Sequence, residues 1–166
     1  PQIEVNTTAA REHVAVIERK IRHVKERVRC TTSELPFQWI PILVLVHFVY
    51  FCVFWLNAFP NRSENYGFSP REIVTGLKTD YARDCKVDPG SYVEASVDAI
   101  VTNDNSERTT SCVALGPAGN RQGSVKCFSI ETGRILYRRT VKSIPWPEDG
   151  KLIRKVEEWG KRGVRT

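Results

Sequence analysis

The sequence predicts an α+β fold, in which a helical N-terminal half precedes a small antiparallel β-sheet or barrel and a short C-terminal helix. Three observations lead to this prediction. Apolar residues recur with helical spacing between residues 14 and 28, and a long apolar run covers 39–59. After residue 90, four short runs rich in β-branched and aromatic residues are separated by turn-forming clusters.

Residues 10–30 are predicted to form an amphipathic helix. Its apolar residues follow one another at alternating spacings of 3 and 4, which is the period of a helix with one buried face. We expect this stripe to pack against a second helix formed by residues 39–58. The stripe consists of Val14, Ile17, Ile21, Val24 and Val28.

Beside this stripe, the same helix carries one carboxylate within a row of cations. At about 100° per residue, Glu18, Arg22, Lys25 and Arg29 fall on one strip of the helix surface. Such a strip suits a polyanionic partner and, at Glu18, a metal ion. The alternative is an ordinary solvated face, because Glu18 and Arg22 also have the spacing of an i,i+4 ion pair.

The apolar run 39–59 is long enough to favour a helix over a strand, and Pro41 suits the first turn of that helix. A buried core helix is the favoured interpretation, because His47 interrupts the middle of an apolar stretch of only 15 residues. A membrane-spanning helix is the less favoured alternative and stays open at this point.

Residues 69–72, Ser-Pro-Arg-Glu, form a capping box with proline at the first helical position, so a short helix is predicted from here to Gly76. Strands are expected at 91–97, 111–116, 124–130 and 134–141, and a last helix at 151–159. The hairpin that turns at 131–133 is expected to gather five cations, namely Lys126, Arg134, Arg138, Arg139 and Lys142.

The composition favours an acidic partner and excludes several site types. The chain has 25 Lys and Arg against 19 Asp and Glu, which suits nucleic acid or an anionic membrane. Its five cysteines form no CxxC pair, and its three histidines have no zinc-finger spacing. Free thiols in a reducing compartment, nuclear or cytoplasmic, are the simplest account. No Ser/His/Asp or Cys/His set has a recognisable local context for nucleophilic catalysis.

The order of these parts resembles the integrase of Ty1/copia-type retrotransposons. Residues 13–26, HVAVIERKIRHVKE, are similar to the segment that carries the third carboxylate of the DDE triad in that family. Residues 35–60 are similar to the buried helix that follows, and 67–80, GFSPREIVTGLKTD, to the next conserved segment of the family. Residues 114–141 resemble its trailing SH3-like barrel.

The resemblance implies the C-terminal part of an RNase H-like core in 1–85, an SH3-like barrel in 86–147 and a charged helix and tail in 148–166. It makes Glu18 a catalytic metal ligand, one of three carboxylates that hold two Mg²⁺ or Mn²⁺ ions in the intact enzyme. It implies DNA as partner and a homo-oligomer in the intact enzyme. The implied DNA-binding residues are Arg22, Lys25, Arg29, Arg134, Arg138 and Arg139.

The chain also departs from the family. The two aspartates of the triad lie upstream in the family, whereas the first aspartate here is Asp80, which stands where the family has proline. We therefore expect an internal piece of a longer protein that is inactive alone and holds no metal stably. Two alternatives stay open: a non-catalytic β-module that binds nucleic acid or protein, and a single-pass membrane protein anchored by 39–59.

Overall fold

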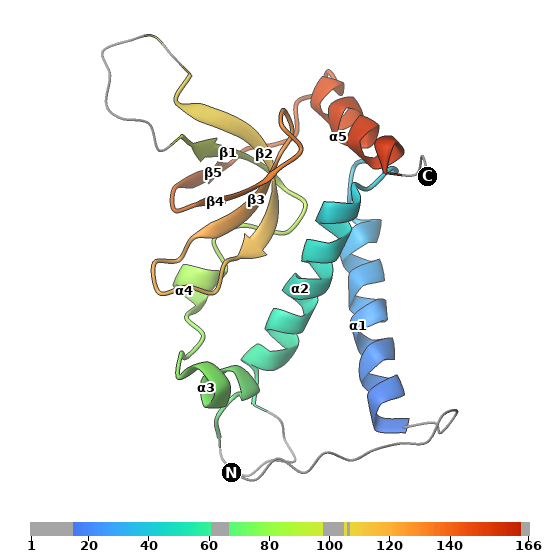
Figure 1. Cartoon of the computed structure of the whole chain (residues 1–166). Helices are drawn as coiled ribbons and strands as arrows, with labels where there is room; N and C mark the ends of the chain where they lie inside the picture. The colour runs from blue at the N-terminus through green and yellow to red at the C-terminus, as the bar shows by residue number, and fades with distance from the viewer. Residues whose placement is uncertain (1–14, 61–66, 98–104, 106, 164–166) are drawn as a thin grey trace.

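The computed structural model describes residues 15–60, 67–97, 105 and 107–163. Within these residues the chain forms helices and one antiparallel sheet, so the predicted α+β class is confirmed (Figure 1). The helices are α1 (Ala15–Ser33), α2 (Ile42–Ala58), α3 (Pro70–Thr75), α4 (Tyr81–Asp84) and α5 (Lys151–Arg162). The strands are β1 (Tyr92–Ser96), β2 (Thr109–Pro117), β3 (Val125–Ser129), β4 (Ile135–Arg138) and β5 (Val141–Ser143).

Helix α2 lies between α1 and the sheet (Figure 1). Its apolar side chains point in all directions, and Val44, Phe48 and Cys52 are buried. The apolar run therefore does form a helix, 17 residues long, with one side buried and the other exposed. In the described part of the chain, no helix is both long enough and apolar enough to cross a membrane.

The apolar stripe of α1 packs against α2 over only part of its length. Val24 and Val28 are half-buried and share a groove with Leu45 and Val49 of α2, as expected. Ile21 lines the same groove but is 48% exposed, and Ile17 is 57% exposed, so the prediction that the whole stripe packs against α2 is wrong at its N-terminal end. The reason is geometric, because the two helices are close near the C-terminus of α1 and diverge towards its N-terminus (Figure 1). Val14 lies outside the described residues.

The two short helices have caps that the sequence encodes. The Ser69 hydroxyl accepts a hydrogen bond from the Glu72 N–H at 3.1 Å, and Gly76 ends α3 with a φ of 65°. Both are as the capping box predicts. Asp80 caps α4, since its Oδ1 accepts hydrogen bonds from the N–H groups of Ala82 and Arg83 at 3.0 and 3.3 Å. The aspartate that departs from the family pattern thus has a local structural role.

The five strands form one sheet in the order β4-β3-β2-β1-β5, with every neighbouring pair antiparallel. The run 134–141, predicted as a single strand, is divided between β4 and β5, which lie at opposite edges of the sheet. Among the described residues no pairing closes β4 onto β5. The structure therefore establishes an antiparallel sheet and not a closed barrel.

The sheet must nevertheless curl. The chain passes from Arg138 at the end of β4 to Val141 at the start of β5 in three residue steps, which span at most about 11 Å. In a flat sheet the outer two of five strands would be about 19 Å apart. The two edges consequently approach each other at the corner formed by Arg139 and Thr140.

Both faces of the sheet are apolar, and they differ in the size of their side chains. One face carries small residues, among them Ala95, Cys112, Ala114 and Cys127, which cluster together with Val93. The other face carries larger side chains and packs against the helices. Its buried cluster, which includes residues of α2 and α5, consists of Phe37, Val44, Phe48, Tyr92, Val113, Leu115, Phe128, Ile130 and Val156.

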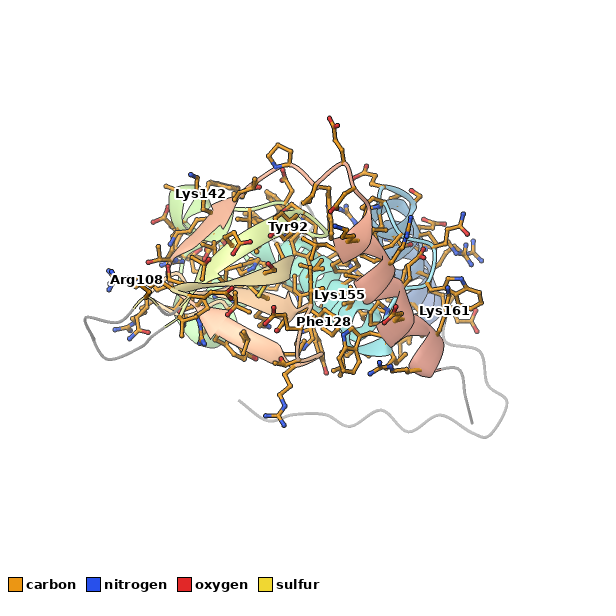
Figure 2. All side chains as sticks on the ribbon, turned by 90° about the horizontal axis from the view of Figure 1, so that it is seen from above. Tyr92, Arg108, Phe128, Lys142, Lys155 and Lys161 are labelled. Atoms are coloured by element: carbon orange, nitrogen blue, oxygen red, sulfur yellow. The ribbon has the colours of Figure 1, made fainter. Side chains whose placement is uncertain are left out.

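Helix α5 covers one end of the second face. Tyr92 and Phe128 lie beside it, whereas Arg108 and Lys142 lie at the far end of the sheet (Figure 2). The Trp159 indole N–H donates a hydrogen bond to the carbonyl of Ile130 at 3.0 Å, which fixes α5 against the end of β3. The helix also touches the backbone that leads into α2, because Gly160 lies against Trp39.

This last contact leads to a stability prediction. A Cβ atom at Gly160 would lie 2.6 Å from the carbonyl carbon of Trp39 and closer still to its oxygen, so Gly160→Ala forces α5 away from the backbone. We expect a loss of about 1–3 kcal/mol in the free energy of unfolding, measured by urea denaturation.

Gly163→Ala is the matched control, because its nearest contact would be an ordinary 3.6 Å from the Gly160 oxygen and its φ of −73° suits any residue. Equal free energies of unfolding for the two variants would show that Gly160 of α5 does not pack against the Trp39 backbone.

Candidate nucleic-acid interface

The cations predicted on the first helix do share one exposed face. Glu18, Arg22, Lys25 and Arg29 are all exposed on α1 and line one open depression of about 500 Å³ together with Ile21 and Glu26. Helical geometry produces this arrangement, because residues three, four and seven apart return to the same side. Glu18 lies in the first turn, where its charge complements the helix dipole. We call the residues Glu18, Arg22, Lys25, Glu26 and Arg29 the α1 ridge.

The α1 ridge is less basic than the spacing of its cations predicts. Glu26 lies in it as a second carboxylate, so the expectation of a lone acid is wrong. The signal was present in the sequence, since Glu26 stands four residues after Arg22, as Arg22 stands four after Glu18. Arg22 therefore has a carboxylate one turn away on each side. The ridge has three cations against two acids, which lowers its attraction for phosphate.

The described residues do not fit the metal ions that the resemblance implies. Glu18 and Glu26 are eight residues apart, about 12 Å along the helix axis, which is too far for both to ligate one ion. In the described part of the chain, no three His, Cys, Asp or Glu side chains are placed to hold a metal ion together. A Mg²⁺ ion normally takes one or two carboxylates together with phosphate oxygens and waters. No catalytic step is therefore assigned to Glu18 in this chain.

The cations predicted on the β-module are separated from the α1 ridge and differ in their exposure. Arg134 and Arg139 are exposed, near the β3–β4 turn and in the β4–β5 corner. Arg138 is half-buried and stands opposite Val125 in the register, where its Nη1 donates to the Tyr137 carbonyl at 3.1 Å. Because α2 lies between α1 and the sheet, these arginines do not extend the α1 ridge (Figure 1).

The expected five-cation cluster at the last hairpin is divided. Lys126 faces α2, with its ammonium 5.9 Å from the centre of the Tyr50 ring, and burial lowers its pKa. Lys142 lies on β5, opposite Glu94 of β1. The division follows from the split of 134–141 into two edge strands, which the sequence pattern did not indicate.

A second set of cations was missed. Lys20, His23 and Arg27 follow the helical spacing of 3 and 4 on the side of α1 away from the ridge. They line a groove with Trp55 and Phe59, at the C-terminal end of α2. Their spacing was visible in the sequence, but the aromatic side of the groove depends on how α1 crosses α2, which no local pattern specifies.

Comparisons with protein-family models, with curated proteins and with solved structures give no match to this chain.

Proposed function

We propose that this chain is the C-terminal part of a Ty1/copia-type integrase and that it binds double-stranded DNA through the α1 ridge. One observation carries the proposal: Arg22, Lys25 and Arg29 project from one exposed face of a helix, in the positions that the resemblance assigns to DNA contact. Cations spaced along an exposed helix face suit the regularly spaced phosphates of a duplex.

The exposed apolar flank of the helix pair supports the RNase H-like part of this proposal. Ile42, Val46, Val49 and Val53 recur at spacings of 4, 3 and 4 on one side of α2, and all four are exposed. Apolar side chains that cluster on a surface usually mark a contact with another layer of structure. A helix pair that packs against the sheet of a larger core would have this flank.

The topology of the β-module supports an SH3-like barrel. The strand order places β5 beside β1, and the two-residue corner at Arg139 and Thr140 draws the outer edges together. The small side chains of Ala95, Cys112 and Ala114 suit the interior of a tightly curled sheet. In the proposed enzyme, this module would hold a further stretch of DNA backbone.

In this proposal Arg22, Lys25 and Arg29 neutralise phosphates and so fix the position of the duplex. Such contacts release counterions and read no sequence, so binding should be largely sequence-independent and strongly dependent on salt. In the intact enzyme Glu18 would be one of the metal ligands, and the metal ions would supply the activation of the attacking oxygen. The other carboxylates would have to come from outside the described residues.

A second candidate function is a β-module that binds nucleic acid without the α1 ridge. The exposure of Arg134 and Arg139 favours it, because both side chains are accessible to a phosphate group. The two candidates place the phosphate contacts on different sides of α2, so separate substitutions distinguish them.

We expect the double variant Arg22→Ala/Lys25→Ala to lower the slope of log K against log salt for duplex DNA by about two, at roughly 0.9 per phosphate contact. The free energy of unfolding should change by less than about 0.5 kcal/mol, because alanine favours helix and surface pairs contribute little. Titration of a labelled duplex at several salt concentrations, by fluorescence anisotropy, measures the slope.

The matched control is Arg154→Ala/Lys155→Ala, which removes two exposed cations from α5 and should leave the slope unchanged. A slope that falls only in Arg134→Ala/Arg139→Ala would assign binding to the β-module. A wild-type slope in Arg22→Ala/Lys25→Ala would mean that the α1 ridge is a solvated face.

A further inference from the structure

A groove of about 450 Å³ lies between α1 and the C-terminal end of α2, on the side of α1 away from the ridge. Its volume lies in the range of about 300–1,000 Å³ that ligand pockets have. Cations line one wall and aromatic rings the other. The residues that matter for its chemistry are Lys20, His23, Arg27, Trp55 and Phe59.

The aromatic wall continues into α4. The rings of Trp55 and Tyr81 are stacked at 6.3 Å with an angle of 12° between them, and Phe59 is tilted by 34° against both. Phe59 and Tyr81 are 50% and 56% exposed. Aromatic rings contribute most to stability when they are buried, so this cluster leaves a large apolar surface of Phe59 and Tyr81 accessible to a partner.

The cationic wall lines the same groove as Trp55 and Phe59. Lys20 and Arg27 are exposed and seven residues apart, so they lie about 10 Å from each other along α1. His23 lies between them. Among the described residues that line this groove, none is acidic, in contrast to the mixed charges of the α1 ridge. The groove therefore combines positive charge with flat apolar surfaces.

We propose that this groove binds an unpaired segment of DNA. Lys20 and Arg27 contact its phosphates, while its bases stack on the exposed ring of Phe59 in the groove and on that of Tyr81, which lies next to Phe59 just outside the groove. Sequence-tolerant sites for single strands combine these two features, because every base has a face that can stack and every nucleotide carries a phosphate. A duplex does not fit this chemistry, since its bases are stacked on one another. The choice of DNA over RNA rests on the proposed function. The inference that the groove binds a single strand does not depend on that function.

The test is the affinity for a labelled dT oligonucleotide of about 12 nucleotides, within the range of known single-strand sites. We expect Phe59→Ala and Tyr81→Ala each to lower this affinity about fivefold or more and to leave duplex binding unchanged. Tyr137→Ala removes an aromatic side chain of similar exposure, 54%, from β4 and should change neither. Circular dichroism confirms that each variant is folded.

A second pair of variants tests the cationic wall without touching the aromatic cluster. Lys20→Ala/Arg27→Ala should weaken dT binding and reduce its salt slope by about 1.4, at roughly 0.7 per contact for a single strand. Arg22→Ala/Lys25→Ala, on the opposite side of α1, should leave dT affinity within about twofold while it weakens duplex binding. The two proposals therefore fail separately.

Three results would overturn the inference. Wild-type affinity for dT in both Phe59→Ala and Tyr81→Ala would show that the rings do not stack on bases. If Tyr137→Ala lowered the affinity for dT as much as Phe59→Ala and Tyr81→Ala do, the binding would be non-specific. Tighter binding of the rU oligonucleotide of the same length would assign the groove to RNA and not to DNA.

Discussion

Replacement of Phe48 by alanine is expected to reduce the free energy of unfolding by about 3–5 kcal/mol. Phe48 is fully buried in the middle of α2, where it packs in one cluster with Phe37, Tyr92, Phe128 and other large residues. The loss has two parts. The free energy gained by burying the ring is lost, and a cavity remains at the contact between α2 and the sheet. Urea denaturation, followed by circular dichroism and tryptophan fluorescence, measures it.

The matched control is Leu43→Ala on the same helix, because Leu43 is 42% exposed and its truncation leaves no cavity. We expect that change to cost less than about 1 kcal/mol. If Phe48→Ala cost no more than Leu43→Ala, or if the helices melted before the sheet in the wild type, α2 would not belong to the core of the β-module.

Elements with a local signal were predicted well from the sequence. The capping box at Ser69 and the glycine at residue 76 determine both ends of α3, and each acts within a few residues of itself. The turn at Gly133, with a φ of 67°, likewise places β3 and β4 side by side. Such signals need no knowledge of the rest of the chain.

Features that depend on distant contacts were predicted poorly. The run 134–141 has a continuous strand-like composition, yet it bends at Arg139 because β5 pairs with β1, which lies more than 40 residues earlier in the chain. The burial of Ile17 and Ile21 depends on the angle between α1 and α2, and the hydrophobic period contains no information about that angle. Sequence periodicity identifies a face but not what covers it.

The candidate site shows the same division. Helical spacing alone grouped Arg22, Lys25 and Arg29 correctly, because all three belong to one regular helix. The groove that α1 forms with Trp55 and Phe59, and the contact of Tyr81 with these two rings, combine residues that are distant in the sequence and were not predicted. Phe59 was assigned to a buried helix as part of the apolar run 39–59, whereas its side chain is 50% exposed.

The protein is expected to lose stability steeply in alkali, through two buried thiols. Cys112 and Cys127 are fully buried on the small-residue face of the sheet, and burial raises the pKa of each to about 12, against 9.0 for an ordinary thiol. The folded state therefore resists deprotonation more than the unfolded state does. This contribution is fully present well below pH 9 and is lost as the pH rises from 9 towards 12. Near pH 10.5 the loss for the pair is about 2–4 kcal/mol.

The measurement is urea unfolding under reducing conditions at about pH 8 and pH 10.5, for the wild type and for Cys112→Ala/Cys127→Ala. Other groups titrate in this range, including Lys126, whose lowered pKa has the opposite effect on stability, but both proteins contain them. The difference between the two pH dependences therefore isolates the thiols.

Cys30→Ala, which removes an exposed thiol, is the control and should behave as the wild type does. Equal alkaline losses in the wild type and the double variant would show that Cys112 and Cys127 are hydrated, and that the curled sheet does not exclude water from its small-residue face.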